Sequence, residues 1–167
     1  GLSCSSNQPD KEILDAIAQA GGIVDVNKNL ISIEKGGLNS FTFDATDCPD
    51  LFPALAALAA NCKGTSTIKG VGRLLHKESD RAATIKSELQ SVGISVILKE
   101  NEMKITGGEI SGGTIDSHND HRIAMMGGIL AINAKSPISI VNSKAITKSY
   151  PNFFQTLNEL GIQTEEC

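Results

Sequence analysis

Apolar and polar positions alternate along this chain with two different periods. Short segments in which every second residue is apolar predict β-strands, and longer segments with apolar residues every three or four positions predict helices. The expected strands are residues 23–27, 30–36, 41–45, 65–70, 94–100, 102–108, 113–117 and 137–142. The expected helices are residues 11–22, 49–62, 78–92, 120–134 and 150–160. Together they predict a mixed α/β (α+β) fold.

Two of the expected helices, residues 49–62 and 120–134, are apolar around most of their circumference. A helix of this kind belongs inside a protein, shielded on all sides. We therefore expect buried helices with the sheets outside them. The second of these helices is preceded by a polar cluster, Asp116 to Arg122, which we expect at its N-terminal end.

The chain contains an internal repeat with a period of 72 residues. Residues 41–68 fall on residues 113–140 without a gap, and residues 89–96 resemble both 157–164 and 14–26. Each repeat predicts strand, apolar helix, strand, amphipathic helix and two further strands, which is a βαβαββ unit.

The repeat predicts a single domain over residues 1–167 with two units and part of a third. The partial first unit covers about residues 1–37 and begins only at its second helix. The second unit covers about 38–108 and the third about 109–167, where the last copy stops at the place of its final strands.

Composition narrows the possible functions. The chain is 40% hydrophobic and 20% charged with a net charge of -4, which argues against a nucleic-acid-binding protein. No apolar run approaches the roughly 20 residues that span a bilayer, so no membrane partner is expected, and the first residues do not resemble a signal peptide. The four cysteines show no CxxC spacing, which predicts free thiols in a reducing compartment such as the cytoplasm.

The N-terminal ends of the helices carry most of the candidate chemistry. The repeat places Asp50 opposite Arg122 at the two apolar helices, and His76 opposite Lys148 before the two amphipathic ones. Basic residues gather at these ends: His76, Lys77, Arg81, Lys144 and Lys148. Helix N-termini attract anions, and arginine binds carboxylate and phosphate with two parallel hydrogen bonds. If the ends converge, they form a site for a polyanionic substrate.

Each of these residues also has a plainer interpretation. Asp50 is compatible with a first-turn carboxylate that favours the helix dipole, with Asp47 as N-cap and Pro49 in the first turn. Glu78 and Arg81 have the spacing of a surface ion pair.

The polar cluster before residue 123 has two plainer interpretations as well. Asn119 is a candidate N-cap with Asp120 as a dipole partner, and Lys144 and Lys148 are compatible with a solvated face. His118, Asp120 and His121 form a conceivable metal site, but neighbouring residues at a helix start point in divergent directions, so no metal is expected.

Three segments resemble the C-terminal domain of EPSP synthase (3-phosphoshikimate 1-carboxyvinyltransferase). They are LHKESDRAATIKSELQSVGISV (75–96), SHNDHRIAMM (117–126) and AITKSYPNFFQTL (145–157). The resemblance runs from about Asp10 to the end. Within the enolpyruvyl transferases, the NDHR segment favours the shikimate branch over the branch that uses UDP-N-acetylglucosamine.

The resemblance implies one domain of a two-domain enzyme, an inside-out barrel in which each domain has three βαβαββ units. The family reaction transfers enolpyruvyl from phosphoenolpyruvate to the 5-hydroxyl of shikimate 3-phosphate and releases phosphate, without a cofactor. The implied partners are these two substrates and the missing N-terminal domain, so the isolated chain is expected to be inactive. A non-catalytic domain that binds small anions, and a relative that acts on UDP-N-acetylglucosamine, remain as alternatives.

The resemblance also implies roles for individual residues. Asp50 corresponds to the base toward the 5-hydroxyl, Glu78 to the group that handles the methylene proton, and Lys77 to a further catalytic residue. The cationic cradle for phosphoenolpyruvate and the departing phosphate corresponds to Lys77, Arg81, Arg122 and Lys148, with Asp120 and His121 as its neighbours. Family members often carry a basic residue two places before the motif lysine. Here that residue is Leu75, and the nearest arginine is Arg73, which we expect to contact substrate.

Overall fold

The structure, a computed structural model, describes residues 7–27, 30–74 and 80–166. The first unit contains η1 (Pro9–Glu12), α1 (Ile13–Gln19), β1 (Ile23–Val26) and β2 (Ile31–Glu34). The second contains β3 (Thr42–Asp44), η2 (Pro49–Leu51), α2 (Phe52–Ala60), β4 (Thr65–Lys69), η3 (Val71–Leu74), α3 (Arg81–Ser91), β5 (Ser95–Lys99) and β6 (Glu102–Thr106). The third contains β7 (Gly113–Asp116), α4 (His121–Ala131), β8 (Ile138–Val141), η4 (Ser143–Lys148) and α5 (Phe153–Glu159).

Strand pairing repeats with the predicted period. In the second unit the strand order is β3-β4-β6-β5, with β3 parallel to β4 and the other neighbours antiparallel. In the third unit β7 runs parallel to β8, and its Thr114–Ser139 pair lies 72 positions beyond the Thr42–Thr67 pair of β3 and β4. The β1–β2 hairpin of the first unit has the register of the β5–β6 hairpin. The predicted βαβαββ unit is confirmed.

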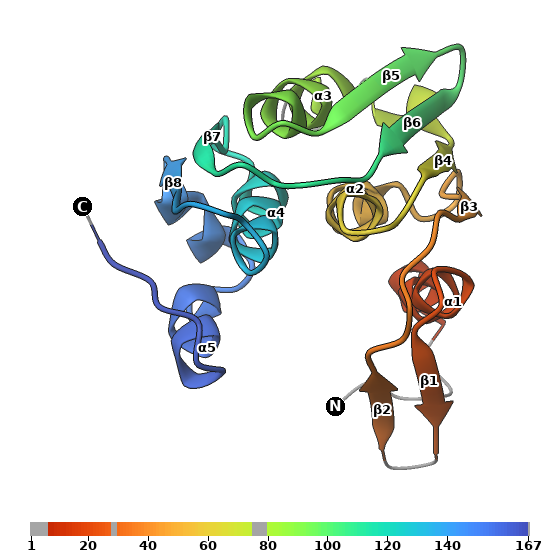
Figure 1. Cartoon of the computed structure of the whole chain (residues 1–167), viewed down its shortest axis with the longest axis horizontal. Helices are drawn as coiled ribbons and strands as arrows, with labels where there is room; N and C mark the ends of the chain where they lie inside the picture. Colours follow the sequence, from red (N-terminus) through yellow and green to blue (C-terminus); the bar gives the residue numbers. More distant parts are fainter. Residues whose placement is uncertain (1–6, 28–29, 75–79, 167) are drawn as a thin grey trace.

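Helices α2 and α4 lie side by side at the centre, with α3 and the β5–β6 hairpin across one side (Figure 1). Most of their buried apolar residues belong to the main apolar core, as the sequence predicts, and Ala124 belongs to a second, smaller cluster. Contacts at both ends show that the helices are parallel. Near the N-terminal ends Arg122 donates to Asp50, and just past the C-terminal ends Asn133 donates to Asn61, at 2.9 and 2.8 Å respectively.

The second helix of every unit ends in the same way. Gly21, Gly93 and Gly161 follow α1, α3 and α5 with φ angles of 97°, 91° and 89°. Glycine reaches this left-handed conformation without steric cost, so it terminates a helix. The last spacing is 68 residues and not 72, because α5 is about one turn shorter than α3. This explains why residues 89–96 align with 157–164.

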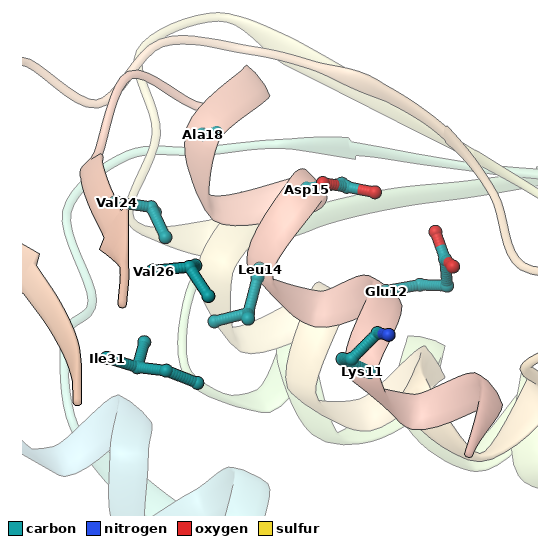
Figure 2. Close-up of a pocket in the computed structure, with 8 residues that line it drawn as sticks. All are labelled: Lys11, Glu12, Leu14, Asp15, Ala18, Val24, Val26 and Ile31. Atoms are coloured by element: carbon teal, nitrogen blue, oxygen red, sulfur yellow. The ribbon is translucent and has the colours of Figure 1, made fainter. Parts of the chain in front are cut away.

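The β1–β2 hairpin has an open apolar face. Met103 and Ile105 of β6 are fully buried, whereas Ile33 of β2, the counterpart of Ile105, is 52% exposed. An open pocket of about 340 Å³ lies between α1 and this hairpin, where Leu14 and Ile31 line its wall (Figure 2). Among the described residues, the first unit has no counterpart of α2, the helix that packs against β6 in the second unit.

No helix in the described part of the chain is long and apolar enough to cross a membrane. Of the four cysteines expected to be free thiols, Cys4 and Cys167 lie outside the described residues, whereas Cys48 and Cys62 are free and buried. Burial raises the pKa of both, that of Cys48 from 9.0 to about 11 with a further contribution from the carboxylates of Glu12 and Asp10.

Cys48 is expected to react slowly in the folded protein. The thiolate is the reactive form, and raising the pKa from 9.0 to about 11 lowers its population at pH 8 about a hundredfold. In a variant with the other three cysteines replaced by serine, alkylation by iodoacetamide should be at least that much slower in buffer than in urea. Equal rates in both solvents would contradict the burial of this thiol.

Candidate functional site

Asp50 joins the N-terminal ends of three helices. It lies in η2, directly before α2, and its side chain is 34% exposed. One carboxylate oxygen accepts from Arg81 Nη1 of α3 and the other from Arg122 Nη2 of α4, each at 2.9 Å. A partly exposed carboxylate is thus held between two guanidinium groups, which are 0% and 28% exposed at their side chains.

Arg81 is fully buried and begins α3. Its Nε donates to Asp120 Oδ2 at 2.8 Å, and Asp120 is also fully buried. The other oxygen of Asp120 accepts from the backbone N–H of Arg122 at 2.9 Å and caps α4. Burying charge is costly unless the charges are paired, and here each charge has a partner. The ion pairs thus form the series Arg122–Asp50–Arg81–Asp120, which starts on α4 and returns to the N-cap of the same helix.

The N-cap residues of α4 and η2 are not the ones expected from the sequence. Asp120, and not Asn119, caps α4. Cys48, and not Asp47, occupies the N-cap position of η2, without a side-chain hydrogen bond. Arg81 is fully buried, so it is not one half of a surface pair. Pro49 and Asp50 do lie in the first turn.

A tight turn precedes α4. His118 and Asn119 both have left-handed φ angles, 49° and 59°. Asp116 Oδ1 accepts from the backbone N–H of His118 at 2.8 Å, and Ser117 Oγ accepts from that of Asn119 at 3.1 Å. The hydrogen bond from His118, followed by one from the Asn142 side chain, lowers the pKa of the Asp116 carboxyl. Non-glycine residues in this conformation are uncommon and often lie at functional sites.

Lys148 reaches this turn from η4. Its Nζ donates to the backbone carbonyl of Asn119 at 2.5 Å. His121, the first residue of α4, is 9% exposed. The start of α4 thus carries Arg122, a buried histidine and the ammonium group of Lys148. The side chains of Arg122 and Lys148 and the helix dipole therefore place positive charge at this end of α4, an arrangement that favours an anion.

The structure therefore brings six of the predicted site residues together: Asp50, Arg81, Asp120, His121, Arg122 and Lys148. Arg73 is exposed on η3 and makes no polar side-chain contact with the described residues of this cluster. Lys77 and Glu78, like His76, lie outside the described residues.

Two of the three residues considered for a metal site, His118 and Asp120, have other partners. His118 Nε2 lies 3.1 Å from Glu88 Oε1, whereas the Asp120 side chain binds Arg81 and the end of the turn. Across residues 7–27, 30–74 and 80–166, no three or more His, Cys, Asp or Glu side chains are grouped so as to hold a metal ion. Glu88 was not predicted as a site residue. In the sequence this residue differs from other charged residues of α3 only in its place beside the buried Leu89.

A family model described as EPSP synthase (3-phosphoshikimate 1-carboxyvinyltransferase) matches residues 1–157. The chain belongs to the EPSP synthase family. The 3-phosphoshikimate 1-carboxyvinyltransferase of Clostridium acetobutylicum is 40% identical over 166 residues, which are 99% of this chain and 38% of that protein. The Pyrococcus furiosus protein of the same name is 41% identical over 150 residues, which are 90% of this chain and 37% of that protein.

Solved structures of the family share the fold. EPSP synthase from Acinetobacter baumannii superposes with a TM-score of 0.78 at 25% identity, covering 99% of this chain and 42% of that chain. The enolpyruvyl transferase NikO from Streptomyces tendae has a TM-score of 0.71 at 19% identity, which shows the fold alone. The chain thus spans less than half the length of these relatives. The predicted family and fold are confirmed, and the boundaries of the three units remain predictions.

Proposed function

We propose that this chain supplies the C-terminal half of an EPSP synthase active site. The complete enzyme would transfer enolpyruvyl from phosphoenolpyruvate to the 5-hydroxyl of shikimate 3-phosphate and release phosphate. The observation that carries this proposal is the Asp50 carboxylate held at 2.9 Å by both Arg81 and Arg122. A base and two cations then meet at converging helix ends, where Asp50 and Arg122 are partly exposed and Arg81 is buried behind them.

The reaction needs both kinds of group. The 5-hydroxyl must lose a proton as it attacks, and Asp50 is the exposed carboxylate placed to accept it. Phosphoenolpyruvate carries a carboxylate and a phosphate, and its negative charge persists through the tetrahedral adduct. Arg122 and Lys148 supply fixed positive charge there, and Arg81 is held in place by Asp120.

The second proton transfer remains a proposal without described geometry. The methylene carbon of phosphoenolpyruvate must gain a proton and later lose one. We assign this role to Glu78 with help from Lys77, because both lie in the KESDR segment that ends at Arg81. Arg73, three residues before His76, is proposed as a substrate contact on its exposed η3 position.

The chain is proposed to need the rest of the enzyme. It spans 38% of its Clostridium acetobutylicum relative, and the apolar face of its β1–β2 hairpin is uncovered. The N-terminal part would cover this face and complete the substrate contacts. Buried free thiols fit a reducing compartment, so we place the enzyme in the cytoplasm.

Phosphate release tests the proposal. The chain alone is compared with a fusion in which the unmatched N-terminal part of the Clostridium acetobutylicum relative precedes it; we call this fusion the chimaera. Release from phosphoenolpyruvate and shikimate 3-phosphate by the chimaera only would support the proposal. Release by the chain alone would contradict the half-site. Phosphate release with UDP-N-acetylglucosamine as the acceptor would instead assign the chain to the enolpyruvyl transferases that use this substrate. Binding of anions without phosphate release would favour a non-catalytic binding domain.

Arg122→Lys tests the cradle. Lysine keeps the charge but loses the planar fork, so the KM for phosphoenolpyruvate in the chimaera should rise about tenfold. Lys135→Arg, an exchange at a residue paired with Glu109, is the matched control and should change nothing. An unchanged KM in Arg122→Lys would remove Arg122 from the cradle.

A further inference from the structure

Glu88 is a buried carboxylate that the proposed chemistry does not use. It lies on α3 and is 6% exposed. One of its oxygens accepts from the backbone N–H of Asp116 at 2.8 Å, and the other lies 3.1 Å from His118 Nε2. A buried carboxylate is costly unless hydrogen-bonded, and both bonds of Glu88 go to the turn before α4.

Helix α3 holds this turn at both ends. Arg81 and Glu88 are seven residues, or two helical turns, apart and lie on the same face of α3. Arg81 binds Asp120 at the end of the turn, and Glu88 binds Asp116 at its beginning. Between these two contacts lie the left-handed residues His118 and Asn119. Such a conformation persists when surrounding contacts enforce it.

The repeat provides an internal comparison. The counterpart of Glu88 in α1 is Ala16, which is buried but carries no charge. The turn before α2 keeps the hydrogen bond from Thr46 N to Asp44 Oδ1, at 3.0 Å. Neither Thr46 nor Asp47 has a positive φ. Of these two equivalent turns, 44–47 and 116–119, the one that contacts Glu88 has the left-handed pair, and the one whose counterpart residue is Ala16 does not.

The conformation of this turn affects the position of Lys148 through the backbone of Asn119. The carbonyl of Asn119 accepts from Lys148 Nζ, so the orientation of this peptide sets where the ammonium group is held. The turn continues directly into Asp120 and Arg122 of α4.

We propose that Glu88 is a positioning residue: its hydrogen bonds to Asp116 and His118 fix the left-handed turn that places Lys148 at the start of α4. Glu88 does not contact substrate. The role in catalysis rests on the proposed function, because the anion that Lys148 meets there is phosphoenolpyruvate. Loss of Glu88 should therefore weaken this substrate and leave shikimate 3-phosphate nearly unaffected.

The test compares Glu88→Ala, Glu88→Gln and Ile85→Val in the chimaera. Glutamine keeps the length and one accepting oxygen, and Ile85→Val is a control for lost packing at another buried residue of the same helix. We expect the KM for phosphoenolpyruvate to rise about tenfold in Glu88→Ala, with that for shikimate 3-phosphate within about twofold. In Glu88→Gln the KM for phosphoenolpyruvate should stay close to that of the unmodified chimaera. Ile85→Val should change the KM of neither substrate. Backbone hydrogen exchange in residues 116–119 should accelerate only in Glu88→Ala.

Three results would overturn the proposal. The first is an unchanged KM for phosphoenolpyruvate in Glu88→Ala, and the second is an equal rise for both substrates. The third is the same change in Ile85→Val, which would reduce Glu88 to a stability role. If the unmodified chimaera releases no phosphate, the proposed function has failed. Glu88 is then judged by hydrogen exchange and by the Kd of inorganic phosphate, which Glu88→Ala should raise; an unchanged Kd overturns the inference.

Discussion

Replacing Asp50 with alanine is expected to lower kcat of the chimaera by about a thousandfold or more, while the fold survives. The size follows from the loss of the base toward the 5-hydroxyl, since general bases contribute roughly 10²–10⁴-fold. The fold survives because Asp50 is partly exposed and Arg81 keeps its hydrogen bond to Asp120. Phosphate release gives kcat, and thermal unfolding of the same sample gives the stability.

Asp50→Asn separates the base from the arginine contacts. Asparagine keeps an accepting oxygen near Arg81 and Arg122 but cannot take the proton, so its kcat should be as low as that of alanine. Exposed Asp25 lies on β1, away from the helix ends, and Asp25→Asn is the matched control. Turnover at the normal rate in either Asp50 variant would refute the base assignment.

Replacing Arg81 with methionine is expected to destabilise the folded chain by about 3–5 kcal/mol, the usual cost of leaving a buried charge without its partner. Asp120 is fully buried and would keep only its bond to the Arg122 backbone. Urea unfolding measures the loss. Arg73→Met changes the same residue type at an exposed site and should stay within about 0.5 kcal/mol.

A second substitution shows whether the loss of stability in Arg81→Met comes from the unpaired charge of Asp120. Adding Asp120→Asn to Arg81→Met removes the orphaned charge, so the double variant should be more stable than Arg81→Met alone. A double variant that loses the sum of the two single effects would show that Arg81 acts through packing and not through the ion pair.

Periodic features of the fold were predictable from the sequence. The 72-residue repeat predicted equivalent units and placed Asp50 and Arg122 at equivalent positions, and the structure adds the matching strand registers and the hydrogen bond between these two residues. The apolar circumference of residues 52–60 is enough to predict a buried helix, since such a segment has no polar face to expose.

Contacts between different elements were not predictable in the same way. Arg81 looks like a surface residue because its neighbours Asp80 and Lys77 are charged, and nothing local indicates that Asp120 buries it. The hydrogen-bonding contact between Glu88 and His118, at 3.1 Å, joins residues thirty positions apart in the sequence. Long-range hydrogen bonds of this kind follow no sequence period, because they depend on how separate elements pack in the folded chain.

The two hydrogen bonds between the central helices have a consequence for how such a chain arises by duplication. At the C-terminal ends the copies have kept the same residue, Asn61 and Asn133, because an amide can donate to its own kind. At the N-terminal ends an identical pair would set carboxylate against carboxylate, or guanidinium against guanidinium, at 2.9 Å. Asp50 and Arg122 can only follow divergence of the two copies. In an assembly of identical subunits both positions would carry the same side chain, so a carboxylate and a guanidinium can pair at equivalent sites here because the two units belong to one chain.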